Sequence, residues 1–165
     1  MQSFKIIKPI HILTPYVRYY WILEDGADVS VSERTLPTGC IQLVFHRGKR
    51  LLLVGKKESQ PQAFICGQCL NFSDVMSAGK IEMITVVFQP YAARAILQLP
   101  LKFFYGELIA VDAIEDLELS ILSRKVIEAD DHETCIRLIE QFLIHRLYRF
   151  EGYEYNLKRI SAVLH

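Results

Sequence analysis

The hydrophobic pattern of this chain changes period at Pro90, and that change constrains the fold more than any other feature. Residues 81–88 (IEMITVVF) form a short, nearly continuous apolar run rich in β-branched residues, which predicts a buried strand. Pro90 suits the first position of a helix, since its missing N–H costs nothing there. The helix should continue through Leu97 and end before Pro100. Strand patterns precede this junction and helix patterns follow it, so we expect an α+β fold.

The first half of the chain carries several short strand patterns separated by turn signals. Residues 16–24 are dense in aromatic and β-branched side chains and predict a strand that follows an extended lead-in over residues 4–13. Further strands are expected at 40–45, 50–54, 63–66 and, past a bulge, 67–73. A solvated loop is expected at 56–62. About six to eight short strands joined by turns are typical of an antiparallel β-barrel or open sandwich.

Two long helices are predicted after the junction. Asp112 and Glu115 have the spacing of a capping box, which predicts a helix from about Ala113 to Glu128. Asp130 and the residues after it repeat this signal for a helix that ends near Arg149. A further helical pattern begins at Tyr155 and continues to His165, with apolar residues that need something to pack on.

Length and charge narrow the class of protein. The chain has 165 residues, enough for one domain with a substantial core. Its 19 Lys and Arg balance its 19 Asp and Glu, so no net charge attracts it to DNA or to anionic membranes. No segment approaches the ~20 apolar residues that a membrane-spanning helix needs, and no secretory signal is present. We therefore expect a cytoplasmic protein with reduced cysteines and no membrane contact.

Four segments, taken in their order and spacing, resemble a known family. They are YVRYYWILE at 16–24, LPTGCIQLVFHRG at 36–48, ICGQ at 65–68 and FQPYAARAILQLPLKFF at 88–104. Together they resemble the N-terminal sensing domain of AraC-family transcription regulators. The sequence departs from the family pattern at Thr38, where the family usually has aspartate, and at Tyr91 and Ala92, where it usually has glycines. Neither departure disrupts the strand or the helix, but both can alter a ligand site.

The resemblance implies both a fold and a function. It implies a cupin-like barrel or open sandwich followed by helices, with residues 1–152 forming one sensing and dimerisation domain. Residues 153–165 would be a linker or the start of a helix-turn-helix domain that this chain lacks. A homodimer and a small-molecule effector are the expected partners, and DNA would be bound only through the missing C-terminal domain. The alternative is a free-standing small-molecule-binding cupin-like barrel or a degenerate enzyme.

Residue patterns for catalysis or metal binding are weak. Cys66 and Cys69 form a single C-x-x-C, but no second pair completes a zinc site, and the motif is expected in a strand or bulge rather than at a helix N-terminus. The five histidines include no closely spaced pair of the kind that a metal-binding cupin presents. No G-x-S-x-G occurs. We expect no catalytic residue, no metal and no cofactor.

An aromatic cluster near the start of the chain is the best candidate for ligand contact. Tyr19 and Trp21 could stack on a sugar or an aromatic effector, with Gln42, His46 and Gln68 as polar anchors in an apolar pocket. Aromatic residues also fill the interior of small barrels, so each of them has a purely structural explanation too. Gln42 alternates with Ile41 and Leu43 and therefore points to the opposite side of its strand. It can bind a ligand only if that side faces the pocket rather than solvent.

The faces of the first strong strand follow from its alternation. Tyr19 and Trp21 share one face with Val17 and Leu23, whereas Tyr20 and Ile22 share the other with Tyr16 and Arg18. Because Arg18 is charged, we expect this second face to be the more solvated one.

The last long helix offers a candidate dimer or docking surface. Ile144 and Tyr148 lie four residues apart, away from the apolar stripe that should face the core, and a monomer would normally place charge there. Arg137 and Glu140 could form a polar rim around them. Alternatively, Ile144 and Tyr148 pack on the barrel of their own chain or on the missing DNA-binding domain.

Overall fold

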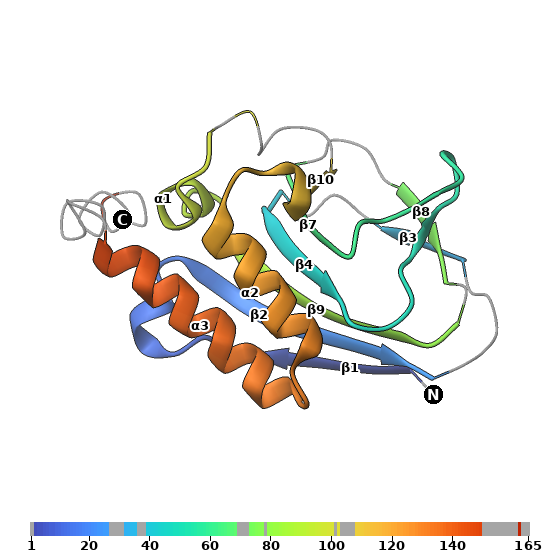
Figure 1. The fold of residues 1–165 in the computed structure, drawn as a ribbon, viewed down its shortest axis with the longest axis horizontal. Coiled ribbons are helices and arrows are strands. Elements are labelled where there is room, and N and C mark those ends of the chain that lie inside the picture. Colours follow the sequence, from blue (N-terminus) through green and yellow to red (C-terminus); the bar gives the residue numbers. More distant parts are fainter. Residues whose placement is uncertain are drawn as a thin grey trace.

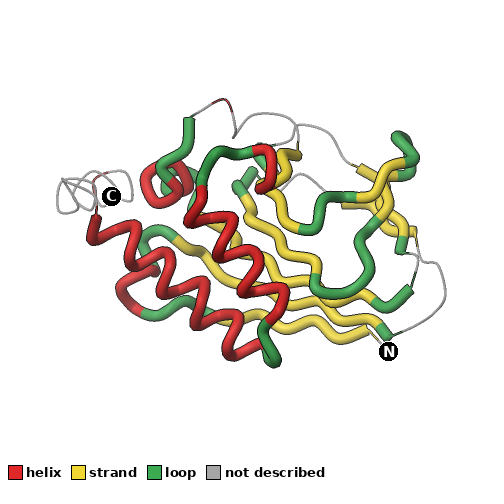
Figure 2. The backbone as a smooth tube through the Cα atoms, in the orientation of Figure 1, coloured by secondary structure: helices red, strands yellow, loops and turns green. Residues whose placement is uncertain are grey.

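A computed structural model describes residues 2–26, 32–35, 39–68, 73–77, 79–100, 102, 108–149 and 162. These residues form three layers: a helical layer, a larger β-sheet and a smaller β-sheet (Figures 1 and 2). Within this part of the chain, the two sheets do not join into a closed barrel. The α+β prediction is confirmed, and the β-half is an open sandwich.

The larger sheet is antiparallel throughout and has the strand order β1-β2-β9-β4-β7-β10. The smaller sheet has the order β3-β8-β5-β6 and is also antiparallel. The strands of the larger sheet are β1 (Gln2–Ile7), β2 (Val17–Asp25), β9 (Ile81–Phe88), β4 (Gln42–His46), β7 (Ala63–Cys66) and β10 (Leu108–Ala110). Those of the smaller sheet are β3 (Ser32–Thr35), β8 (Ser73–Met76), β5 (Leu52–Leu53) and β6 (Glu58–Ser59).

Strand β9 is the centre of the molecule, as the apolar run at 81–88 predicts. It lies between β2 and β4, and all of its residues except Glu82 are buried. One face packs under the helices and the other faces the smaller sheet, so both sets of alternating side chains avoid water. A strand that is covered on both faces has no solvated side, which explains why its sequence shows no polar alternation.

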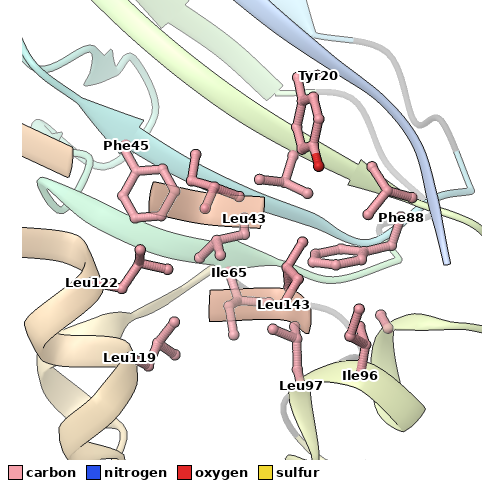
Figure 3. Packing of buried hydrophobic residues seen from close by; sticks show 14 of the residues in the cluster. Tyr20, Leu43, Phe45, Ile65, Phe88, Ile96, Leu97, Leu119, Leu122 and Leu143 are labelled. Carbon is pink, nitrogen blue, oxygen red and sulfur yellow. The ribbon is translucent and has the colours of Figure 1, made fainter. Parts of the chain in front are cut away.

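The helical layer covers one face of the larger sheet (Figures 1 and 2). It consists mainly of α1 (Ala93–Leu97), α2 (Leu117–Glu128) and α3 (His132–Arg149). Two short 3₁₀ turns, η1 (His11–Leu13) and η3 (Val111–Ala113), complete it. Figure 3 shows how the labelled side chains of α1, α2 and α3 meet those of the sheet. These buried residues include Tyr20, Leu43, Phe45, Ile65, Phe88, Ile96, Leu119 and Leu143.

One helix begins where the sequence predicts and the other begins later. The side chain of Asp131 accepts a hydrogen bond from the backbone N–H of Thr134 at 2.7 Å and so caps α3. In contrast, α2 begins at Leu117 rather than near Ala113. Asp116, not Asp112, is its N-cap and accepts from the N–H of Leu119 at 3.0 Å. Ile114 is extended and buried, which delays the start of the helix.

Tyr19, Trp21 and Leu23 share one face of β2 and Tyr20 and Ile22 share the other, as expected, but the expectation of which face is more solvated is wrong. Tyr20 and Ile22, expected on the more solvated face, are buried under the helices, while Trp21 and Leu23 are half-buried on the other face. A register irregularity lies between Val17 and Tyr19. This irregularity interrupts the alternation of side chains. The exposure of Arg18 therefore does not predict that the residues after it on the same expected face are exposed.

Some elements differ from expectation. A short strand, β6, forms inside the predicted loop at 56–62, and β10 returns to the larger sheet in a region expected to be mainly helical. The expected lead-in forms β1 followed by η1. The helical pattern at 155–165 lies outside the described residues except for Ala162. None of the described helices combines the length and hydrophobicity that crossing a membrane requires.

Candidate ligand-binding face

Strand register brings four of the five predicted ligand residues onto one face of the larger sheet. Tyr19 and Gln42 both lie opposite Val87, and Trp21 lies opposite Thr85. His46 lies opposite Met83 on β4. Residues directly opposite each other in adjacent antiparallel strands point to the same side. Gln42 therefore shares the face of Tyr19 and Trp21, which settles the question that alternation alone left open.

This face is the interior of the sandwich. Val44, Phe64 and Met83 of the larger sheet form an apolar cluster with Leu51 and Val75, and Trp21 packs against it. Trp21 is half-buried because it lies on β2, near the side of the sheet where β1 is exposed. Its ring also meets that of Phe4, with 5.7 Å between the ring centroids. An aromatic side chain is thus available at the border between the core and solvent.

His46 is buried on this face with one ring nitrogen unused. Its Nε2 lies 2.9 Å from Oε1 of Gln60. Because that amide oxygen can only accept, Nε2 carries the proton and Nδ1 is an acceptor. Nδ1 has no partner among the described residues. Burial lowers the pKa of His46 below its ordinary value; the Gln60 hydrogen bond opposes this shift and the charge of Arg50 adds to it.

Thr85 adds a second unused polar atom that the sequence analysis missed. Its side chain is fully buried, and its hydroxyl has no hydrogen-bond partner within the described part of the chain. Thr85 lies opposite Val44, two residues from His46, so Thr85 and His46 are diagonal neighbours roughly 7–8 Å apart. The available signal was a single hydroxyl residue inside the apolar run at 81–88. Buried polar atoms are normally bonded, so an unbonded pair on one face suits a bound molecule or water.

Gln68, the fifth predicted residue, has a separate role. Its side-chain Nε2 donates to the carbonyl oxygen of Gly39 at 3.0 Å, which ties the chain after β7 to the turn before β4. Cys66 ends β7 in a strand rather than at a helix N-terminus, and Cys69 lies outside the described residues.

The predicted docking residues on α3 do not form one outward surface. Tyr148 is 66% exposed and Arg137 is exposed. Glu140, however, accepts hydrogen bonds from the backbone N–H of Ile10 at 3.1 Å and the hydroxyl of Tyr20 at 3.2 Å. Burial, and then this carboxylate, raise the pKa of Tyr20. Ile144 is half-buried against the core of its own chain.

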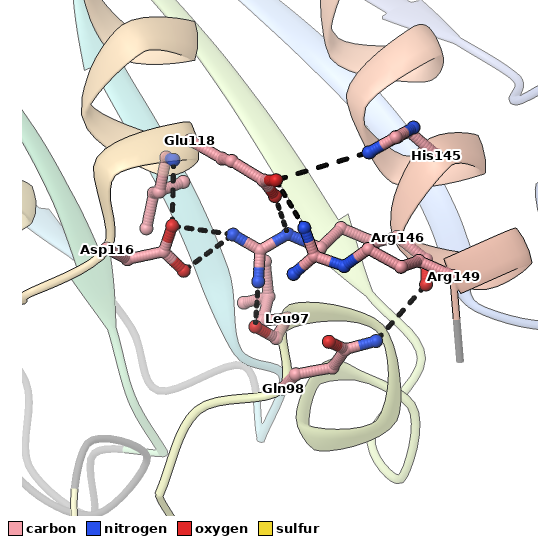
Figure 4. A network of polar contacts seen from close by, with 8 residues as sticks. Leu97, Gln98, Asp116, Glu118, His145, Arg146 and Arg149 are labelled. Atoms are coloured by element: carbon pink, nitrogen blue, oxygen red, sulfur yellow. Dashed lines mark hydrogen bonds and ion pairs between the residues drawn. The ribbon is translucent and has the colours of Figure 1, made fainter. Parts of the chain in front are cut away.

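A buried ion-pair network, not anticipated from the sequence, joins the three helices (Figure 4). Arg146 is only 4% exposed, and its Nη2 lies 2.6 Å from both carboxylate oxygens of Asp116. Its Nη1 donates to the carbonyl oxygen of Leu97 at 3.2 Å, and its Nε lies 3.1 Å from Oε2 of Glu118, without hydrogen-bond alignment. Gln98 donates back to the carbonyl oxygen of Arg146 at 3.1 Å. Arg146 thus holds the end of α1 and the start of α2 against α3.

A second ion-pair cluster lies where α3 begins. Glu24 and Glu82 are directly opposite on β2 and β9, and Nε2 of His132 is 3.5 Å and 3.0 Å from their carboxylates. This is the one group in the described part of the chain with metal-compatible spacing. The same oxygen of Glu82 is also 2.9 Å from Nε of Arg47. Arg47 already supplies a positive charge to this cluster, which therefore has a structural explanation as ion pairing.

A family model described as a domain of unknown function (DUF6597) matches residues 5–110, well over half of the chain. The match covers nearly all of both sheets and α1, and it stops before α2 and α3. No curated protein matches the sequence.

Proposed function

The chain belongs to the DUF6597 family, and from the resemblance of its sequence segments we propose that it is the effector-sensing and dimerisation domain of an AraC-type transcription regulator. DNA would be bound by a separate C-terminal domain of the same protein. The observation that carries this proposal is the place of the four resembling segments. They supply nearly all of β2, all of β4, the end of β7 and the last residue of β9; these strands are adjacent in the larger sheet, and the last segment continues into α1.

The candidate effector site is the interior face that carries Trp21, Thr85 and His46. Burial lowers the pKa of His46 on this face, so that its imidazole is neutral at physiological pH. A charged ligand would lose its hydration among the apolar side chains of this face, which is unfavourable. The effector is therefore a small uncharged molecule with an apolar or aromatic body and at least one hydrogen-bond donor for Nδ1 of His46.

DNA binding by the complete gene product tests the regulatory part of the proposal. The protein expressed from the complete gene should protect a discrete operator next to that gene or its targets in a footprinting assay. The 165-residue chain alone should not, because its equal numbers of basic and acidic residues provide no counterion-release term. A complete gene product without specific DNA binding would contradict the proposal and favour a free-standing small-molecule-binding protein.

Fluorescence of Trp21, the single tryptophan, tests the sensing part. Uncharged sugars and aromatic compounds should be titrated while quenching or a spectral shift is recorded. Thr85→Val is the matched variant, since it removes the unbonded hydroxyl at nearly constant volume. A ligand that uses this hydroxyl should bind Thr85→Val about tenfold more weakly, as expected for loss of one hydrogen bond. Equal affinities for the two proteins would show that the ligand does not use this hydroxyl.

A further inference from the structure

Among the described strands, β1 is an edge of the larger sheet. It pairs with β2 on one side, and no other described strand pairs with it. Its residues from Gln2 to Ile6 are all exposed, in contrast to the buried strands at the centre of the sheet. Such an edge presents a row of backbone N–H and C=O groups that another strand can pair with. The chemistry of this surface therefore calls for an extended segment as its partner.

An apolar strip runs along the same edge. Phe4 and Ile6 are 59% and 57% exposed. They lie opposite Leu23 and Trp21, so all four side chains share one face. The Phe4 and Trp21 rings are already in contact, with their centroids 5.7 Å apart. A second strand added at β1 would extend this face and cover the two most exposed members of the strip.

We propose that β1 pairs with β1 of a second copy of this chain, around a two-fold axis that passes between the two Phe4 residues. The choice of a second copy rests on the proposed function, because regulators that read paired half-sites act as dimers. The surface itself stands on the geometry of the edge. Pairing would join the two larger sheets into one continuous antiparallel sheet.

The charged residues Lys5 and Glu24 favour this register of the two β1 strands. With the axis at Phe4, Lys5 of one copy faces Ser3 of the other, and Ser3 lies opposite Glu24 within its own chain. Lys5 and Glu24 of the two copies are then two strand spacings apart, about 9.6 Å. Their long side chains can meet across the intervening serine. Glu24 is 48% exposed, and its carboxylate also lies 3.5 Å from Nε2 of His132.

The neighbouring registers are less favourable. An axis at Lys5 places the two Lys5 residues directly opposite each other, and like charges in that position are destabilising. An axis at Ile6 places Phe4 opposite Lys8, which leaves the aromatic ring unmatched. Only a short strand is paired in any of these registers, so the buried area falls below the ~1,200 Å² of a stable interface. The dimer is accordingly weak and concentration-dependent.

Cysteine cross-linking of the 165-residue chain tests the register. In the proposed dimer the two Phe4 residues face each other within disulfide range, about 4.4–6.8 Å between Cα atoms. The two Ile6 residues are four positions out of register, roughly 13 Å apart along the strands. Phe4→Cys should therefore form a covalent dimer under mild oxidation. The matched variant Ile6→Cys and the unmodified protein, with its native thiols, should not. Equal cross-linking of the two variants, or of neither, overturns the proposal.

Sedimentation velocity tests the association itself. The sedimentation coefficient of the unmodified chain should rise with concentration, and Phe4→Glu should abolish that rise while the circular dichroism spectrum stays unchanged. Leu117→Glu is the control, since Leu117 is 74% exposed on α2, far from β1 in the fold (Figure 1). A chain that stays monomeric at every concentration overturns the interface and leaves the edge to a strand of another protein. The footprinting result does not depend on either outcome, so failure of the interface and failure of the proposed function can be told apart.

Discussion

At the scale of single residues, the unbonded hydroxyl of Thr85 makes a clear prediction. Thr85→Val keeps the shape of the side chain and removes a buried polar atom that has no partner. The free energy of unfolding should therefore stay within about 0.5 kcal/mol of the original or increase. Thr134→Val is the matched control, because the Thr134 hydroxyl donates to Asp131 at 3.1 Å. Thr134→Val should lower the urea midpoint, whereas Thr85→Val should not. A large decrease in the free energy of unfolding for Thr85→Val would show that the Thr85 hydroxyl makes a hydrogen bond.

His46 predicts a dependence of stability on pH. Its pKa is lowered in the folded chain, so the unfolded chain binds the proton more readily. Its contribution to stability is complete above the ordinary histidine pKa, about 6.5, and is lost as pH falls below that value. The urea midpoint should decrease more steeply between pH 6.5 and 5 for the original protein than for His46→Asn. Parallel pH profiles would mean that the pKa of His46 is not lowered in the folded state.

At the scale of elements, Arg146 should matter far more than its neighbour Arg149. Arg146 is buried between Asp116, Glu118 and the carbonyl oxygen of Leu97, whereas Arg149 is 52% exposed. Arg146→Met should reduce the free energy of unfolding by about 3 kcal/mol, since it leaves the mostly buried carboxylate of Asp116 without its cation. Arg149→Met should cost at most about 1 kcal/mol. Similar losses in chemical denaturation would mean that the network does not hold the helices together.

Burial raises the pKa of Asp116, but hydrogen bonds and charge from Arg146, with smaller contributions from Leu119 and Arg149, outweigh it and leave this pKa below its ordinary value. The carboxylate therefore supports the fold above the ordinary aspartate pKa, about 3.9. That contribution is lost as pH falls through the lowered value. In Arg146→Met, the free energy of unfolding should therefore decrease less steeply than in the original protein as the pH falls below about 3.9.

Substitutions of two residues on α3, Ile144 and Tyr148, test whether each side chain packs in the core or docks a partner. Ile144 is half-buried against its own core, and Tyr148 is 66% exposed. Ile144→Asp should lower the free energy of unfolding by about 1–3 kcal/mol. Tyr148→Ser should change it by less than about 0.5 kcal/mol. If Tyr148→Ser instead shifts the thermal transition strongly, this tyrosine is part of a buried contact.

At the scale of the whole molecule, stability should fall from the centre of the larger sheet to its β1 edge. Strand β9 is covered on both faces, while β1 is exposed along most of its length. Amide hydrogens of β9 should exchange only on global unfolding, and those of β1 through local opening that requires much less free energy. Hydrogen exchange at low protein concentration measures this difference. Equal protection of the two strands would show that the sheet opens as one unit.

Local chemistry in the sequence determined the elements that depend on near neighbours. The apolar run at 81–88 predicts β9 because a strand buried on both faces needs apolar side chains at every position. Asp131 predicts the start of α3 because a cap acts within one turn. The choice of Asp116 over Asp112 as the other cap required knowledge that Ile114 is held extended in the core.

Only the tertiary structure decided which faces and which distant residues meet. The alternation of β2 is interrupted near Arg18, and the helices that bury Tyr20 lie more than a hundred residues away in sequence. Register places Gln42, Trp21 and Thr85 on one face, and no local pattern carries that information. The Arg146 network has the same origin, since its partners come from three helices. Local sequence determines how the backbone folds nearby, whereas pairing and packing between distant segments determine what each side chain contacts.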